Sequence, residues 1–318
     1  MADERRAGDA ASQQGGGAGE EGPKQLTLLF AGALGAAIAL AAIVGDAQRW
    51  YPSGYHHHAG GPQLFLWVFL MASQLALSAA LLVPTLEIVH KLLRDASPRA
   101  LKRVMLHVSA ILVIVLAFVL TTTFDLAPNF RMPISGLKQR VLALNTVSLA
   151  VVLVGAIGGW LLQFAIEDEC RPENGTSLWR FSELRLQLNR LLWVVGTILG
   201  TSIVSMAGLR NAVNTYHSDA SSFPWQYVFI YGAFFSSLLA LAYLPIHARA
   251  LRVGRTLRDQ LLPKPTDASW QTIANWQTNR RVLEDALSLD LSGNSSVRTV
   301  AAILIPLAGS LIGLLLKS

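Results

Sequence analysis

A run of uncharged residues, 64–83, constrains the fold of this chain more than any other feature. These 20 residues, at about 1.5 Å each, are long enough to cross the hydrocarbon core of a bilayer as one helix. A cluster of cations follows at once: Lys91, Arg94, Arg99, Lys102 and Arg103. Because Lys and Arg beside a span stay on the cytoplasmic side, the run and the cluster predict both a transmembrane helix and its orientation.

The composition favours a single membrane domain. Of 318 residues, 52% are hydrophobic and 14% are charged, whereas soluble domains carry about 25% charged residues. The formal net charge of +6 comes largely from cations beside apolar runs, so anionic lipid headgroups are the expected partner. No basic and aromatic motif favours nucleic acid, which we exclude as a partner. Cys170 is the only cysteine, which excludes an intramolecular disulfide.

Seven apolar runs predict an all-α polytopic transmembrane helical bundle with six spans plus a C-terminal seventh, because helices satisfy their own backbone hydrogen bonds in lipid. The runs are residues 26–44, 64–83, 104–124, 141–164, 191–209, 225–244 and 300–316. The first run has two interpretations, an uncleaved span or the core of a signal peptide, and its long polar lead and the lack of a clean small-x-small site after it favour the uncleaved span. The last run has only 17 residues and contains Pro306, so an interfacial or re-entrant hairpin stays open.

The runs and the segments between them divide the chain into four parts. These are a disordered cytoplasmic tail (1–24), a six-span core (25–247), a cytoplasmic helical segment (248–297) and a C-terminal hydrophobic segment (298–318). The tail is polar and glycine-rich, so it cannot bury enough surface to offset its ordering entropy. We expect the sixth span to continue as a basic helix up to Pro263, and a second helix to begin at Asp267 or Ser269, which are good N-caps.

The distribution of cations predicts the orientation of the whole chain. With the N-terminus inside, 20 Lys and Arg residues fall on the cytoplasmic side and 6 on the other side. This agrees with the positive-inside rule. Arginine outnumbers lysine 20 to 6, a bias common in GC-rich bacterial genomes. We therefore predict a multi-pass protein of the plasma (inner) membrane with a cytoplasmic N-terminus.

Ionisable side chains near the cytoplasmic ends of the second and third spans are candidates for permeation or proton coupling. Glu87 and His90 share one helix face, and His107 opens the next span from the same side. Ionisable groups at membrane depth are usually functional. The structural alternative is that Glu87 forms a helix ion pair with Lys91 and that both histidines lie at headgroup depth.

Small polar residues form a stripe along the fifth span. Thr197, Thr201 and Ser205 alternate with glycines at four-residue spacing. Close helix packing explains such a stripe, and the alternative is that its hydroxyls line a permeation path. Several amide and hydroxyl side chains in other spans also need partners inside the bundle: Gln74, Asn145, Thr146 and Gln163.

Four arginines recur at every third position after the sixth span: Arg249, Arg252, Arg255 and Arg258. A voltage sensor needs such arginines inside the hydrocarbon, whereas these follow Pro245 among polar residues. We therefore expect a basic helix that faces anionic lipid headgroups.

Histidines in two predicted outer loops suggest a metal site. His56, His57 and His58 lie in the first outer loop, and His217 lies in a later one. Imidazole is a ligand for zinc, copper and iron, so a divalent metal is the one cofactor that the residues suggest, although none is required. Three consecutive histidines cannot all point at one ion, and a solvated loop is the alternative.

Three functions remain open at this stage. The first is a small channel or secondary transporter whose path runs between the fourth, fifth and sixth spans. The second is a non-catalytic scaffold, sensor or membrane-disrupting effector, with a cytoplasmic partner or a second copy bound through residues 267–290. The third is a membrane enzyme with its metal on the outer histidines. No nucleotide-binding motif is present, which disfavours a nucleotide-driven pump unless a separate subunit supplies the motor.

Overall fold

The computed structural model describes residues 27–28, 30–38, 61–126, 137–169, 177–217, 223–266, 269–287 and 294–315. The described part of the chain is helical and contains no strand. Beyond a helical stretch within residues 27–38, the helices are α4 (Gly61–Asp95), α5 (Pro98–Leu126), α6 (Leu137–Glu169), α7 (Ser177–His217), α8 (Trp225–Leu261), α9 (Trp270–Ala286) and α10 (Asn294–Leu315). The all-α class is therefore confirmed.

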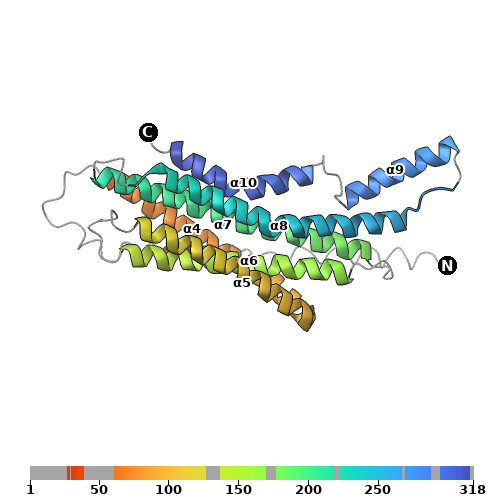
Figure 1. The fold of residues 1–318 in the computed structure, drawn as a ribbon, viewed down its shortest axis with the longest axis horizontal. Helices are drawn as coiled ribbons and strands as arrows, with labels where there is room; N and C mark the ends of the chain where they lie inside the picture. The colour runs from red at the N-terminus through yellow and green to blue at the C-terminus, as the bar shows by residue number, and fades with distance from the viewer. Residues whose placement is uncertain are drawn as a thin grey trace, which may run out of the picture.

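The helices form an elongated bundle with α7 at its centre (Figure 1). Helix α7 contacts α4, α6, α8 and α10, and it is the most buried of the long apolar helices. Helix α5 lies at the edge of the bundle, where it packs mainly against α6 and is the least buried. The centre of the bundle is therefore the place where residues from many helices meet.

Five helices, α4 to α8, are long and apolar enough to cross a membrane. The first predicted run is described only within residues 27–38, and the last forms a shorter apolar helix over Thr299–Gly313. Helix α7 has 41 residues, about twice the number that a span requires. Helices α7 and α8 are therefore both longer than a span, which agrees with the helical extensions that the sequence predicts at the start of α7 and the end of α8.

Small residues let α10 pack deeply against α7 and α8. A Cβ atom built on Gly196 would lie 2.6 Å from the backbone oxygen of Ala302, and one on Gly232 would lie 2.8 Å from Ser310 Cβ. Gly200 approaches Ile305 in the same way, so α10 runs parallel to α7. The glycine part of the predicted stripe thus serves close helix packing.

Helix α10 bends near Pro306 (Figure 1), as expected for a residue that has no N–H to donate to the preceding turn. Ser236 of α8 lies beside the bend, and its hydroxyl accepts a hydrogen bond from the backbone N–H of Leu307 at 3.0 Å. The side chain of an adjacent helix therefore binds the backbone at the bend.

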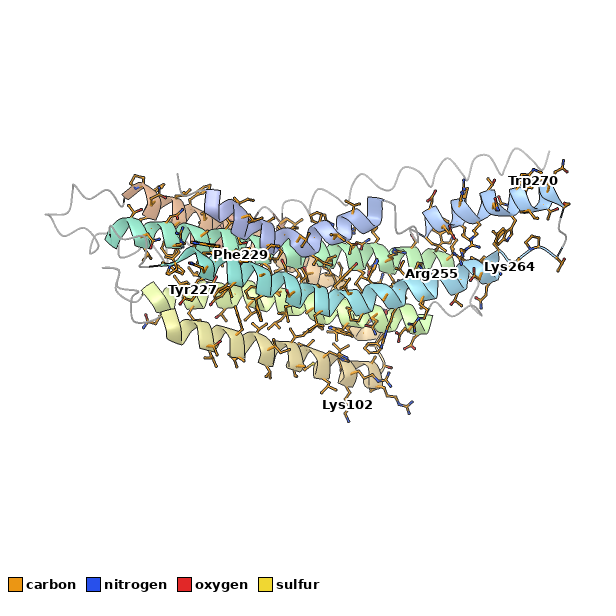
Figure 2. The ribbon with its side chains drawn as sticks, turned by 45° about the horizontal axis from the view of Figure 1, so that its top comes forward. Lys102, Tyr227, Phe229, Arg255, Lys264 and Trp270 are labelled. Carbon is orange, nitrogen blue, oxygen red and sulfur yellow. The ribbon has the colours of Figure 1, made fainter. Side chains whose placement is uncertain are left out.

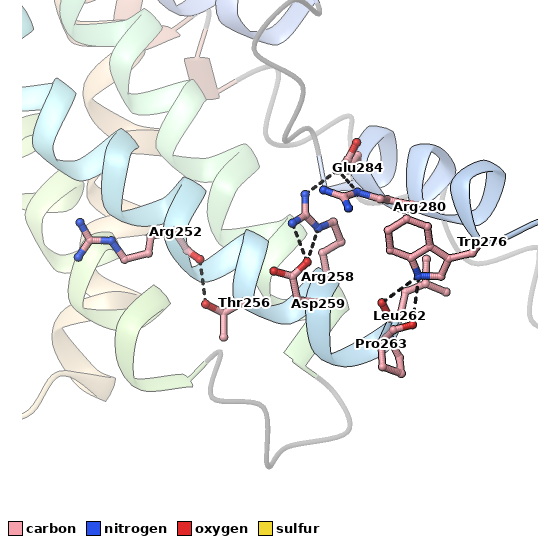
Figure 3. A network of polar contacts seen from close by, with 9 residues as sticks. All are labelled: Arg252, Thr256, Arg258, Asp259, Leu262, Pro263, Trp276, Arg280 and Glu284. Atoms are coloured by element: carbon pink, nitrogen blue, oxygen red, sulfur yellow. Dashed lines mark hydrogen bonds and ion pairs between the residues drawn. The ribbon is translucent and has the colours of Figure 1, made fainter. Parts of the chain in front are cut away.

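Helix α9 docks on the ends of α7 and α8 that extend from the bundle. Arg258 contacts Glu284 at 2.5 Å, and the indole N–H of Trp276 donates to the Pro263 oxygen at 3.1 Å (Figure 3). Arg185, which is buried, donates to the backbone oxygen of Leu287 at 2.6 Å. Ser269 caps the start of α9 by accepting from the N–H of Thr272, which confirms the predicted N-cap.

Candidate functional site

A cavity of about 310 Å³ lies between α4, α5, α6, α7 and α8. Side chains from all five helices line it, including Trp67, Val115, Thr146, Ser205 and Phe235. Most of the lining is apolar, and the volume is at the lower end of the range for ligand sites in proteins. The cavity is the strongest candidate site in the described part of the chain.

A cluster of hydrogen-bonding side chains lies beside the cavity and joins three helices. The amide nitrogen of Gln74 in α4 lies 2.9 Å from Ser148 Oγ in α6 and 2.8 Å from Ser202 Oγ in α7. It also lies 3.3 Å from Asn145 Oδ1, and Ser78 contacts Ser148 at 3.1 Å. Because lipid offers no hydrogen bonds, these groups stabilise one another across the bundle.

Three polar atoms in this region have no hydrogen-bond partner among the described residues. They are the indole nitrogen of Trp67, the hydroxyl of Ser205 and the amide oxygen of Gln74. All three residues are 1% exposed, and Trp67 and Ser205 line the cavity. Buried polar groups without partners are costly, so these atoms favour a site that receives a polar group from a bound molecule or from water.

The cavity is open on one side and closed toward one end of the bundle. Three of its lining residues, Leu142, Asn145 and Thr146, are exposed, and all belong to the first turns of α6. Toward the other end of α6, Trp160 and Leu161 are buried in the main apolar core, which also contains Leu191 of α7. The described side chains thus form a one-sided cavity rather than an open pore.

The polar residues of the predicted stripe on α7 differ in whether they line the cavity. Ser205 lines the cavity, whereas Thr201 donates its hydroxyl to backbone oxygens of its own helix at 3.0 Å. Thr197, one turn earlier, is half-buried and does not belong to the lining. Sequence reasoning missed Ser202 and Trp67. Ser202 follows Thr201 directly and so falls outside the four-residue spacing of the stripe. In the sequence, nothing distinguishes Trp67 from the tryptophans expected at the membrane interfaces.

The three ionisable candidates lie away from this cavity. Glu87 and His90 are exposed, and His107 stacks on Trp160 with ring centroids 4.2 Å apart. No hydrogen bond or ion pair between Glu87, His90 and His107 is found among the described contacts. Lys91 pairs with Glu183 of α7 at 3.4 Å instead of with Glu87. The structure therefore does not bring these three residues together.

The four arginines after the sixth span have different surroundings. Arg249 pairs with Glu167 at 3.1 Å, and Arg258 pairs with Asp259 and Glu284. Arg252 and Arg255 are exposed. Because α8 continues as one helix from Trp225 to Leu261, Arg252, Arg255 and Arg258 lie beyond the usual length of a span. Arg249 is also exposed, and Arg252 and Arg255 form no ion pair among the described contacts, so binding of the four arginines to anionic headgroups stays a prediction.

The predicted histidine metal site cannot be described. His56, His57 and His58 lie outside the described residues, and only the backbone of His217, the last residue of α7, is described. Within the described ranges, no group of three or more His, Cys, Asp or Glu side chains is arranged to hold a metal ion. The outer metal site therefore stays a prediction.

The fold and the cavity define a class: an α-helical, multi-span membrane protein with a largely apolar cavity inside its bundle. No protein-family model, curated protein or solved structure matches the chain. Its function is therefore argued from its own geometry.

Proposed function

We propose that the protein is a small channel or secondary transporter that carries a small solute through the cavity. The observation that supports this proposal is a cavity between five helices, open on one side, where buried Trp67 and Ser205 have hydrogen-bonding groups without partners. Transporters hold their substrates near the middle of the bundle, between helices that move relative to one another. The cavity likewise lies between several helices.

The one-sided shape favours a transporter over a permanently open channel. A pore needs a continuous path, whereas the core around Trp160 and Leu191 is packed. In an alternating-access cycle, a site is open to one side at a time, and rearrangement of helices opens the other side. Helix α5 is the best candidate for the moving element because it is the least buried long helix and packs mainly against α6.

The orientation follows from the charges at the two ends. Lys102, Arg255 and Lys264 lie toward one end of the molecule, and Tyr227 and Phe229 lie toward the other (Figure 2). By the positive-inside rule the basic end faces the cytoplasm, and in a bacterium the membrane is the plasma (inner) membrane. The cavity then lies in the outer half of the bundle, because its lining belongs to the halves of α4, α6, α7 and α8 away from the basic end.

The test is solute flux into liposomes that contain the purified protein. A panel of small neutral solutes should enter faster than into empty liposomes. Thr146→Phe should slow this flux at least about fivefold, because Thr146 is exposed at the open side of the cavity and a ring there narrows it.

Val147→Phe is the matched control for this test. Val147 is the next residue of α6, is also exposed, and does not line the cavity. Its substitution should leave flux unchanged. Equal flux in both variants and in the parent protein, or flux no faster than through empty liposomes, would exclude transport through this cavity.

A second candidate function is binding of a cytoplasmic partner through α9. The observation that favours it is Trp270, which is 81% exposed at the start of a helix outside the apolar bundle. Exposed tryptophans are frequent anchors at protein interfaces. A photo-crosslinker at position 270 should then capture one discrete partner or a second copy, whereas the same group at Asn279, which faces the opposite side of α9, should not.

A further inference from the structure

We infer that the cavity selects an uncharged, largely apolar molecule that carries one hydroxyl or carbonyl group, and that Trp67 and Ser205 bind this group. This inference rests on the proposed function, because it names the class of solute. It is carried by three features of the site: the absence of charge among the described lining residues, the apolar surface, and the two buried polar atoms that have no partner among the described residues.

The lining excludes an ionic solute. The described residues of the lining include no Lys, Arg, Asp, Glu or His. An ion held inside a membrane bundle needs an opposite charge or several ordered dipoles, because its transfer from water is costly. The nearby amide nitrogen of Gln74 is already engaged by Ser148 and Ser202. A neutral solute is therefore the class that this cavity can desolvate.

Most of the cavity wall suits hydrocarbon. Met71, Leu199, Ile203, Leu209 and Phe235 contribute apolar surface from α4, α7 and α8. Transfer of an apolar group from water to such a surface is favourable, and this free energy depends little on the exact shape of the group. The body of the solute is therefore apolar.

The two unpaired atoms specify the polar group. The indole N–H of Trp67 can only donate, and the Ser205 hydroxyl can donate and accept. Both residues are 1% exposed, so bulk water does not reach them freely. A hydroxyl or carbonyl oxygen on the bound molecule can accept from either group, and a hydroxyl can also donate to Ser205. A hydrocarbon chain, such as a lipid tail, would leave both atoms unpaired.

The test compares three probes of nearly equal size: benzyl alcohol, toluene and benzoate. Their dissociation constants are measured by ligand-observed NMR with the protein in nanodiscs, after subtraction of binding to empty nanodiscs. Benzyl alcohol should bind about tenfold more tightly than toluene, because it pairs the two buried groups. Benzoate should not bind detectably.

Variants assign the preference to the two residues. Ser205→Ala and Trp67→Phe should each reduce the preference for benzyl alcohol over toluene by about threefold or more, with little effect on toluene. Thr201→Ala is the control, since its hydroxyl bonds its own helix and does not line the cavity. If Trp67→Phe does not fold, Ser205→Ala decides the matter, because it removes only a hydroxyl that has no partner.

The outcomes separate this inference from the proposed function. Equal affinity for toluene and benzyl alcohol, detectable binding of benzoate, or an unchanged preference in Ser205→Ala would overturn the inference. Selective binding of benzyl alcohol without flux would support the inference and contradict transport. Flux that Thr146→Phe blocks, with no preference for the alcohol, would support transport and overturn the inference.

Discussion

Buried polar side chains in this protein differ in whether the fold supplies a partner. Arg185 is 6% exposed and donates to the backbone oxygen of Leu287, at the C-terminal end of α9, where the helix dipole favours a cation. Trp67 and Ser205 are still more buried, at 1% exposed, and the indole nitrogen and the hydroxyl have no partner among the described residues. The Arg185 contact links α7 to α9. The unpaired groups of Trp67 and Ser205 are the reason to expect a ligand.

Glu284 makes the docking of α9 sensitive to pH. The hydrogen bond from Arg280 is the largest influence that lowers the pKa of the Glu284 carboxyl below its ordinary value of 4.5; Arg258 lowers it further, and partial burial opposes both. Arg280 lies on α9 with Glu284, so its effect on the pKa does not depend on docking, whereas Arg258 lies on α8 and contacts Glu284 only when α9 is docked. The Arg258 contact makes the pKa of Glu284 lower in the docked state than in the undocked state. The carboxylate therefore stabilises docking above its undocked pKa, and this contribution is lost as the pH falls through the docked-state value.

Spin labels at Gln260 and Gln277, with Cys170 replaced by serine, would report the distance between α8 and α9. We expect the distance to broaden and lengthen as the pH falls from 7 to 3. Glu284→Gln should show weaker docking at neutral pH and a smaller change on acidification. An acid transition of equal size in that variant would assign the effect to other carboxylates.

At the scale of the elements, glycines at the contacts of α10 let its backbone pack closely against α7 and α8. The close approaches of Gly196 to Ala302 and of Gly309 to the Gly200 backbone oxygen leave no room for a Cβ atom. Without a hydrophobic effect between helices in lipid, such close packing is a main source of association. The seventh apolar segment is therefore part of the bundle despite its short length.

Gly196→Ala should loosen α10 and destabilise the protein by about 1–3 kcal/mol, because the new Cβ meets a backbone oxygen that no rotamer change can move. Gly159→Ala in α6 is the matched control. Its Cβ would lie 3.7 Å from Ile246 Cδ1, an ordinary contact, so we expect no loss. Unfolding of both variants in detergent measures the difference, and equal stability would contradict the packing argument.

At the scale of the whole molecule, α10 closes the bundle instead of forming an appendage. A chain that ends at Leu262 would uncover Gly196 and Gly200 on α7 and Gly232 on α8. We expect its melting temperature in detergent to fall by at least about 5 °C. A protease site placed within residues 288–293 and cut after folding provides the control, because α10 then stays in place. An unchanged melting temperature in the truncated chain would show that α10 is dispensable.

Local properties of the sequence determined the helical class and the ends of several helices. Long uncharged runs favour membrane-spanning helices, because a helix satisfies its own backbone hydrogen bonds in lipid. Pro263 and Ser269 affect only the backbone next to them, so the end of α8 and the start of α9 could be predicted. The cation distribution likewise predicts an orientation without knowledge of any contact.

Only the tertiary structure decided which residues meet. Gln74 joins Ser148 and Ser202 across 74 and 128 positions of sequence, and Gly196 and Ser205 lie on the same helix but face α10 and the cavity, respectively. The physical reason is that lipid is as apolar as a helix interface, so hydrophobic periodicity does not reveal which face of a span packs inward. The rotation of each helix, and with it the candidate site, depends on packing against its neighbours.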